Sequence, residues 1–491
     1  MIGNPPWLGL RTGELNSKLL RWLRLRFESS VGQFDLAATF CELACLLSSA
    51  GTRIGVVVPK RLLTNESYEG LRKMLAVKRH LSSAVDLGVA FEGVDNDAAI
   101  MISGGSSDRQ PATLLGRRVS KTSLVFHPVP SSALKTMPFH IVPLNSQAAA
   151  VKLASKIAAA DVVPLGDLAG IARGAECGMN HPAISRIRTP DSLLLIDHLD
   201  MDRHYVAHEG WFVDPSKIEA ATLKPAALYR TVPKLLIRFL APGLIAARDD
   251  VGYATTNLVY HVACGEESSF LCAILCSRLL SFWYRTAFQN DEVKFPHVQK
   301  SHLVRLPIPR VEPATPQSRR ATLLTQGRDL CQRALRDGQP DAVLLFVAEQ
   351  LAGKPARADV VHDMVAFLAG QMTGLSREGR AAAKQFLTDI GDFDGIQAHT
   401  LKPRTKLDRF WELEAAQLFA HLRDNKVRLQ DSDEQRIRAR FQNAKDNLLS
   451  LQSSLAFTDG LIDEIVYRLY GLTREEIEVV KETAGPGKPD D

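Results

Sequence analysis

Asn4-Pro5-Pro6-Trp7, preceded by Met1-Ile2-Gly3, is the stretch from which the rest of the chain is interpreted. The two prolines fix φ and keep the preceding residues extended. The Asn4 amide oxygen and the Pro5 carbonyl oxygen are then held ready to accept the two N–H groups of an exocyclic amine. Trp7 offers a flat apolar face on which a base flipped out of a duplex could stack. A proline turn with an exposed tryptophan is the alternative interpretation of these four residues.

Downstream of this motif, helical and strand patterns alternate. Residues 34–47 predict a helix with Leu36, Phe40, Leu43 and Leu47 as a stripe facing the core. Residues 54–58 predict a strand buried on both faces, and two more apolar runs, 81–87 and 98–102, predict further strands. The first 105 residues are therefore α/β, with fewer strands than a complete doubly wound sheet.

Several segments carry motifs in a familiar order and spacing: Asn4 to Trp7, Gln33 to Ala44, Gly55 to Lys60, Leu63 to Arg72, Val85 to Gly88, Phe91 to Asp95 and Ala98 to Ile102. Together they resemble the catalytic domain of N6-adenine-specific DNA methyltransferases of the large type II restriction–modification kind. The resemblance implies that Asn4 and Pro5 hold the target amine, within the catalytic motif completed by Pro6 and Trp7. It also implies that residues 60–65 lie near the rim of the active site. Phe91 would pack on the flipped base, although a core phenylalanine at a strand end is equally consistent with its position.

One departure from that family concerns the cofactor, S-adenosylmethionine. Family members bind it mainly through a Gly-rich turn and an acidic residue that precede the Asn-Pro-Pro-aromatic motif, and neither is found in this sequence. The expectation is an N-terminally truncated, incomplete Rossmann-like methyltransferase half, with most of the cofactor site absent and its cofactor-binding residues unknown. A separate N-terminal methyltransferase or nuclease chain is then an expected partner.

A second resemblance covers residues 161–310, which follow an expected linker with short strands at 106–160. The run Arg173-Gly174-Ala175-Glu176-Cys177-Gly178-Met179-Asn180 resembles the start of TaqI-like specificity domains, and Leu306-Pro307-Ile308-Pro309 resembles their end. The resemblance implies a mixed α/β target recognition domain for double-stranded DNA, with Arg173, Gly174, Gly178 and Asn180 near the duplex. An ordinary loop is the alternative for this glycine-containing run.

Composition narrows the class of protein further. Residues 106–310 carry 23 Lys and Arg against 17 Asp and Glu, so a polyanion is expected to dock there if anywhere. Seven cysteines without a Cys-x-x-Cys pair predict a reducing cytoplasm and no structural zinc. Cys272 and Cys276 are expected to be buried thiols on one helix face, and His204 and His208 are not expected to bind metal.

Glu292-x-Lys294 lacks the partner carboxylate of a nuclease site, and no apolar run is long enough to span a membrane.

The remaining residues, 311–484, predict a helical C-terminal region. One apolar stripe comprises Val361, Met364, Val365, Leu368 and Met372, and a second comprises Ile462, Ile465, Val466 and Leu469. Thr473 and Glu476 predict a capping box, and residues 485–491 predict a disordered tail. The combined expectation is a DNA methyltransferase that is inactive without the N-terminal half that carries most of the cofactor site. The alternative hypothesis is a catalytically silent DNA-recognition subunit or remnant.

Overall fold

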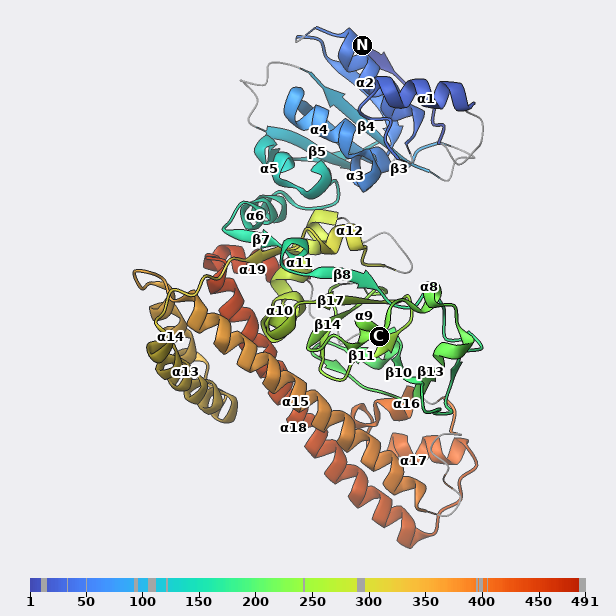
Figure 1. Ribbon diagram of the computed structural model, residues 1–491, viewed down its shortest axis with the longest axis vertical. Helices are drawn as coiled ribbons and strands as arrows, with labels where there is room; N and C mark the ends of the chain where they lie inside the picture. The colour runs from blue at the N-terminus through green and yellow to red at the C-terminus, as the bar shows by residue number, and fades with distance from the viewer. Residues whose placement is uncertain are drawn as a thin grey trace.

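The computed structural model describes residues 1–9, 16–32, 34–49, 51–91, 96–104, 112–120, 122–241, 243–288, 296–393, 396, 401–403 and 405–484. Three parts follow one another along the chain (Figure 1): a sheet with helices, a strand-rich middle and a long helical arm. The α/β fold class with a helical C-terminal region is therefore confirmed. The predicted tail, 485–491, and Glu292-x-Lys294 lie outside the described residues.

The first part contains a mixed sheet, in which the described strands follow the order β1-β2-β4-β3-β5-β6. β1 is parallel to β2, and β3 is parallel to β5, while β4 runs antiparallel to both β2 and β3. The strands are β1 (Ile2–Gly3), β2 (Ile54–Pro59), β3 (Leu81–Val89), β4 (Asp97–Ser103), β5 (Ala112–Arg118) and β6 (Leu124–Pro130). The helices are α1 (Ser17–Arg26), α2 (Leu36–Leu47), α3 (Arg61–Thr64), η2 (Glu66–Tyr68), α4 (Glu69–Lys73), η3 (Met74–Lys78), α5 (Ser131–Thr136), η4 (Pro138–His140) and α6 (Ala148–Ala158).

The segment expected to be a linker, 106–160, contributes two strands to this same sheet. β5 pairs with β3 from Ser83↔Leu114 to Asp86↔Arg117, and β6 pairs with β5 along its whole length. Leu115 and Val129 are buried in the core of the first part. The sheet therefore continues beyond residue 105 and ends at Pro130.

Helix α2 forms where it was predicted but turns a different face to the core. Of the predicted stripe, Phe40, Leu43 and Leu47 are exposed and Leu36 is half-buried, whereas Ala37, Ala38, Cys41 and Cys45 are buried. The predicted stripe is therefore wrong. The buried Glu42 fixes the rotation of the helix, because its carboxylate accepts from the backbone N–H groups of Glu28 (3.0 Å) and Ser29 (2.7 Å). Small side chains on the inner face let the helix lie close to the sheet.

The middle part is built from short strands. One set of described strands has the order β15-β14-β17-β8, a second β16-β10-β13-β9, and two pairs are β11-β12 and β18-β7. The strands are β7 (Val162–Pro164), β8 (Gly170–Arg173), β9 (Ile184–Ser185), β10 (Leu193–Ile196), β11 (Met201–Asp202), β12 (Tyr205–Val206), β13 (Trp211–Val213), β14 (Lys234–Arg238), β15 (Ala246–Asp249), β16 (Ala254–Thr255), β17 (Val259–Ala263) and β18 (Pro307–Pro309). The α-helices are α7 (Leu165–Leu168), α8 (Ala220–Leu223), α9 (Ala226–Arg230), α10 (Ser268–Cys276), α11 (Arg278–Phe288) and α12 (Lys300–Leu303), with short η5 (His198–Asp200), η6 (Pro215–Lys217) and η7 (Gly265–Glu267).

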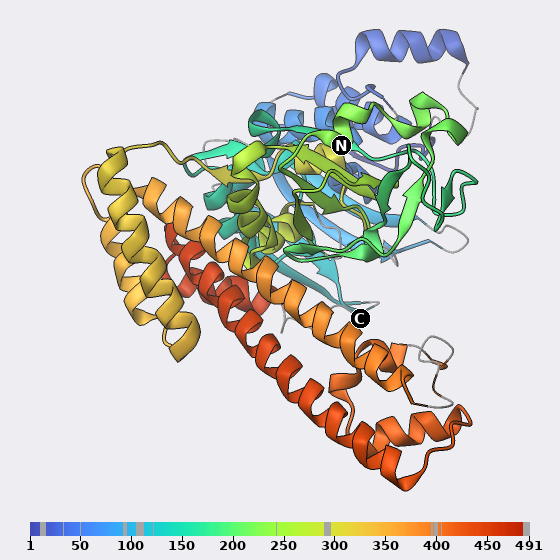
Figure 2. The same ribbon diagram turned by 60° about the horizontal axis from the view of Figure 1, so that its bottom comes forward.

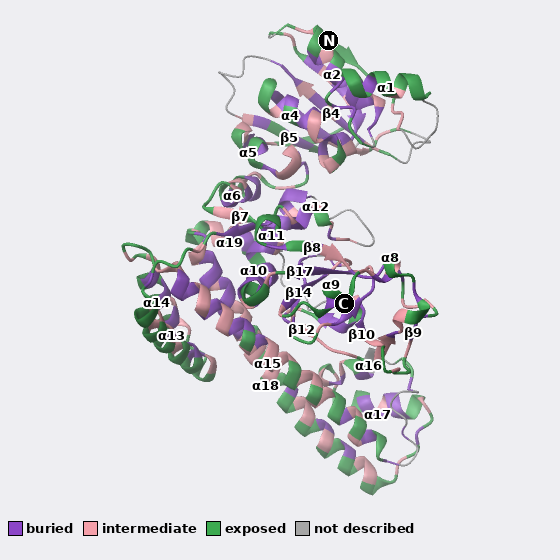
Figure 3. Ribbon diagram, viewed as in Figure 1, coloured by how far each residue is buried: buried purple, intermediate pink, exposed green. Residues whose placement is uncertain are grey.

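The third part is a helical arm. α15 (Ala358–Gly391) and α18 (Asp431–Leu469) run side by side away from the sheets (Figure 2), and α13 (Gln317–Asp337) and α14 (Asp341–Leu351) pack against them. The predicted stripe from Val361 to Met372 is buried, and the Thr473–Glu476 capping box is present in both directions. A second apolar core at the far end of the arm includes Phe386 and Phe441 and is visible as buried segments in Figure 3. The remaining elements are α16 (Thr405–Asp408), η9 (Phe410–Glu412), α17 (Ala415–Asp424) and α19 (Arg474–Ala484).

None of the helices in the described ranges has the combination of length and apolar composition needed to cross a membrane.

Candidate functional site

The ends of three parallel strands bring the predicted site residues to one edge of the first sheet. β1 is parallel to β2, and β4 is antiparallel to both β2 and β3, so β1, β2 and β3 all end at the same edge. The motif Asn4 to Trp7 follows β1, Lys60 follows β2, and Phe91 lies two residues after the end of β3. In open α/β sheets, ligands bind beyond the carboxyl ends of parallel strands. This edge is therefore the candidate site.

The two predicted aromatic residues meet there. The rings of Trp7 and Phe91 pack edge to face, with centroids 5.7 Å apart and an interplanar angle of 77°. Phe91 is 40% exposed, Asn4 is exposed, and Trp7 is half-buried against the core. The buried Trp7 Nε1 has no hydrogen-bond acceptor among the described residues. The aromatic pair thus offers an apolar surface close in sequence to an exposed amide, which suits a flat ligand with a polar edge.

The chain leaving the motif is anchored by α2 and α3. The Leu8 carbonyl oxygen accepts a bond of 3.0 Å from the Leu36 backbone N–H. The buried Asp35 caps α2 through the Ala37 N–H (2.9 Å), and its other oxygen lies 2.6 Å from Arg61 Nη2. Burial opposes the charge on Arg61, but the hydrogen bond that Arg61 donates to Asp35 and the nearby charges of Tyr68 and Asp35 together outweigh burial and raise the pKa of the guanidinium. Leu8, directly after the motif, is therefore bonded to the first turn of α2, whose N-terminus carries this ion pair.

A second ion pair sits at the end of β2, at the position that the resemblance places near the rim. Lys60 is buried, and its Nζ lies 2.8 Å from Asp86 Oδ2 and 3.8 Å from Asp97 Oδ2. These partners come from β3 and β4, so the sequence pattern gave no signal for the pairing. The three acidic residues described here, Asp35, Asp86 and Asp97, are all engaged by basic side chains.

The predicted DNA-contacting loop lies in the middle part, at the end of β8. Arg173 is half-buried: its Nε donates to the Asn257 carbonyl (2.8 Å), and its guanidinium lies 4.1 Å from the ring centroid of Phe239. Gly174 is buried, whereas Gly178 and Asn180 are exposed. The structure therefore ties Arg173 into the domain and leaves the second half of the loop open to solvent.

Three segments of the chain match known protein families. Residues 1–91 match the Eco57I restriction-modification methylase, residues 197–308 match the TaqI-like C-terminal specificity domain, and residues 361–466 match a domain of unknown function, DUF8810. The chain thus has one segment similar to a restriction-modification methylase and one similar to a specificity domain. The TaqI-like match begins after the loop that contains Arg173 and Asn180, and the methylase match includes both Trp7 and Phe91.

Solved structures that match part of the chain include two from restriction enzymes. BpuSI, described as a type IIG restriction endonuclease, has a TM-score of 0.29 and 11% identity, covering 64% of this chain and 47% of its own. MmeI, described as a type IIL restriction-modification enzyme in complex with DNA, has a TM-score of 0.41 and 12% identity, covering 91% of this chain and 57% of its own. The chain thus spans about half the length of these proteins. No curated protein matches the chain in sequence.

Proposed function

We propose that this chain is the target-amine and DNA-recognition part of a site-specific methyltransferase that modifies adenine N6 in duplex DNA within a restriction–modification or phage-defence system. The observation that carries the proposal is the exposed Asn4 beside the Trp7–Phe91 pair, at the carboxyl edge of three parallel strands. These residues fall in the segment that matches a restriction-modification methylase. Seven cysteines, none in a disulfide among the described residues, agree with work in the reducing cytoplasm.

The proposed chemistry concerns the lone pair of the amine. An adenine N6 amine is a weak nucleophile because its lone pair is delocalised into the ring. The Asn4 amide oxygen and the Pro5 carbonyl oxygen would accept its two N–H groups, which localises the lone pair toward the methyl donor. Trp7 and Phe91 would hold the flipped base by stacking. A separate strong base is not required, because the amine loses its proton after methylation.

S-adenosylmethionine, the expected methyl donor, does not fit the described residues at this edge. A ribose needs an acidic acceptor, but Asp35 is held by Arg61, and Asp86 and Asp97 are held by Lys60. We therefore propose that the donor is bound by residues other than these, next to β1, which lies at the end of the described strand order. In this proposal the chain described here orients the amine and recognises DNA.

The proposed DNA partner is recognised through the middle part. The TaqI-like match and the basic excess of residues 106–310 support this role. Arg188 and Arg230 are exposed and suited to phosphate contacts, whereas Arg173 supports the fold of the loop through Phe239 and Asn257. The exposed Gly178 and Asn180 remain the members of the predicted loop that could approach the duplex.

The test is transfer of labelled methyl groups from S-adenosylmethionine to duplex DNA, with the product identified as N6-methyladenine. The chain is assayed together with a polypeptide that supplies the Gly-rich cofactor motifs. Asn4→Ala should reduce the rate by roughly 10²–10³, as for loss of one preorganised polar partner. Asn443→Ala, which changes an exposed asparagine on α18, is the matched control and should leave the rate unchanged.

Two results would change the proposal. If the reconstituted enzyme is active and Asn4→Ala retains the parent rate, the motif is a proline turn and the assigned chemistry is wrong. If no methyl transfer appears but duplex DNA binds with strong salt dependence, the second candidate, a silent DNA-recognition subunit, takes its place. The specificity-domain match is the observation that favours this second candidate.

A further inference from the structure

Three potential metal ligands from distant parts of the sequence meet in the middle part. His204 occupies the tight turn between β11 and β12, and Cys272 and Cys276 lie one turn apart on α10. One ligand atom from each residue lies within 4.8 Å of the others. The sequence predicted two buried thiols on one helix face, which is confirmed, and gave no reason to bring an imidazole to them.

The spacing of these atoms suits a tetrahedral ion. His204 Nδ1 lies 3.6 Å from Cys272 Sγ. In a tetrahedral zinc site with Zn–N of roughly 2.0–2.1 Å and Zn–S of about 2.3 Å, the nitrogen and sulfur ligands are separated by about 3.6 Å. An ion could therefore enter with small side-chain adjustments.

The burial and orientation of the ligands also suit a metal. His204, Cys272 and Cys276 are 1%, 2% and 2% exposed. Both thiols point at one acceptor, since Cys272 Sγ lies 3.5 Å and Cys276 Sγ 3.2 Å from the Ala246 carbonyl oxygen.

We propose that His204, Cys272 and Cys276 form a buried structural site for one zinc ion. Binding replaces the two thiol protons, which leave to solvent, by one Zn²⁺, and two Zn–S bonds and one Zn–N bond form without any change of oxidation state. The two thiolates and the divalent ion sum to zero charge, so the loaded site suits an apolar interior better than a monovalent ion with the same ligands. The Ala246 carbonyl oxygen, which no longer accepts from the thiols, keeps its hydrogen bond from the His204 backbone N–H at 2.8 Å.

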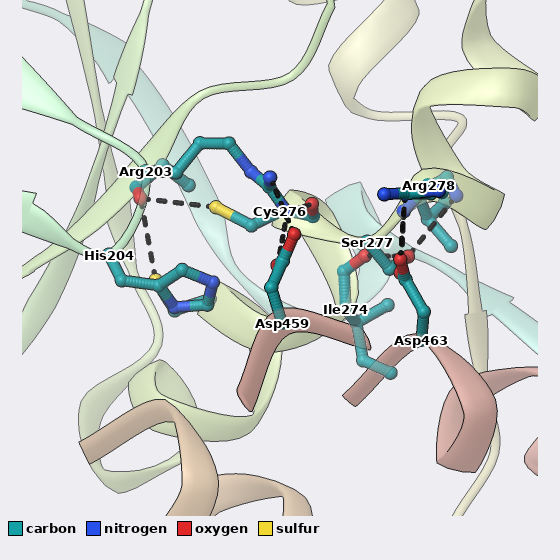
Figure 4. Close-up of polar contacts among 11 residues, drawn as sticks. Arg203, His204, Ile274, Cys276, Ser277, Arg278, Asp459 and Asp463 are labelled. Carbon is teal, nitrogen blue, oxygen red and sulfur yellow. Dashed lines mark hydrogen bonds and ion pairs between the residues drawn. The ribbon is translucent and has the colours of Figure 1, made fainter. Parts of the chain in front are cut away.

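The location of the site indicates what the ion stabilises. Arg203, next to His204, donates to the Cys276 carbonyl oxygen and forms a bidentate pair with Asp459 of α18 at 2.6 and 3.0 Å. Figure 4 shows Arg203 reaching between Cys276 and Asp459, with His204 beside it. A zinc ion would fix the β11–β12 turn on α10 and thereby hold Arg203 against the arm.

The experiment measures metal in the full-length chain, purified without chelator and loaded with Zn²⁺ during refolding. About one zinc per chain is expected, with two sulfur ligands and a nitrogen ligand in the X-ray absorption spectrum. Co²⁺ substituted for Zn²⁺ should show thiolate-to-cobalt absorption, and chelation should lower the thermal midpoint. Cu⁺ loaded in place of Zn²⁺ is the comparison for a monovalent thiophilic ion.

Single-residue variants assign the ligands. Cys276→Ser and His204→Gln should each weaken zinc binding by more than roughly 100-fold, beyond the loss typical of an outer-shell partner. Cys331→Ser, which changes an equally buried cysteine on α13, should keep the full zinc content. Zinc below a tenth of an equivalent after loading of the folded parent chain, or tighter binding of Cu⁺ than of Zn²⁺, would overturn the proposal. The zinc stoichiometry and the absorption spectrum are measured on the parent chain. These two measurements therefore decide the proposal even if a variant fails to fold.

Discussion

Two glycines in the predicted DNA-contacting loop have different physical roles. A Cβ at Gly174 would lie 2.0 Å from Thr255 Oγ1 and 2.4 Å from the Thr256 carbonyl oxygen, and no substituted residue fits there without movement of β16. A Cβ at Gly178 would meet nothing within 4 Å. Gly174 is therefore explained by packing inside the domain, whereas Gly178 is free to serve an external contact.

The matched variants Gly174→Ala and Gly178→Ala separate these roles. Gly174→Ala should lower the free energy of unfolding by about 2 kcal/mol or more, because backbone and buried hydroxyl must move. Gly178→Ala should stay within about 0.5 kcal/mol in stability. Thermal denaturation of the two variants measures both effects, and equal stabilities would contradict the close packing at Gly174.

At the scale of the element, α2 shows that a hydrophobic stripe does not by itself decide which face of a helix is buried. Phe40 is 47% exposed, whereas Phe34, just before the helix, is 1% exposed. The helix carries apolar residues on more than one face, and its rotation is set by Asp35 at the cap and the buried Glu42. The hydrogen bonds of these two acidic residues therefore determine that the face of α2 with small side chains packs on the sheet.

Substitution of two phenylalanines measures the orientation of α2. Phe40→Ser should change the free energy of unfolding by less than about 1 kcal/mol, since about half of that ring is already in water. Phe34→Ser should lower it by roughly 3–5 kcal/mol, as for loss of a buried aromatic side chain. Chemical denaturation of both variants gives the comparison. Equal losses would mean that the outer face of α2 is covered in solution.

At the scale of the whole molecule, polar contacts join the three parts. Glu69 of the first part faces Arg305 of the middle part at 3.9 Å, and Glu66 lies 3.7 Å from His302, whose pKa is lowered to about 4 by burial. The arm is joined through Asp463 of α18, which accepts from the Arg278 backbone N–H at 2.8 Å and lies 3.2 Å from Arg278 Nε. These polar contacts lie at the joints of one apolar core that has members in all three parts.

The joint at Asp463 should make stability depend on pH. Burial, and then repulsion from Asp459, raises the pKa of Asp463 to about 7, while Arg203 and Arg278 act in the opposite direction. The unfolded carboxyl titrates near pH 3.9. The folded chain therefore binds the extra proton between about pH 4 and pH 7, and this contribution is complete below pH 4 and is lost as the pH rises through 7.

Asp463→Asn should remove that dependence. As the pH rises from about 4.5 to 7.5, the parent chain should lose on the order of 2–4 kcal/mol of stability relative to the variant. The thermal midpoint measured across this pH range is the readout. Asp446→Asn, an exposed change on the same helix, is the control and should follow the parent. Parallel pH profiles for the parent chain and Asp463→Asn would show that the carboxyl is ionised throughout.

The sequence by itself determined the features that repeat locally. The buried stripe from Val361 to Met372 follows from helical spacing, and the Thr473 capping box joins residues three apart. The resemblance also indicated Trp7 and Phe91, but their contact depends on β1 and β3 ending at one edge.

Only the tertiary structure decided the features that join distant segments. The face of α2 toward the sheet, the addition of β5 and β6, and the pairing of Lys60 with Asp86 depend on how separate elements dock. The same holds for His204, which lies 68 residues before Cys272 in sequence. The spacing of residues along the chain does not predict such contacts. Their geometry is fixed only when the core packs and each buried polar group forms its hydrogen bond or ion pair.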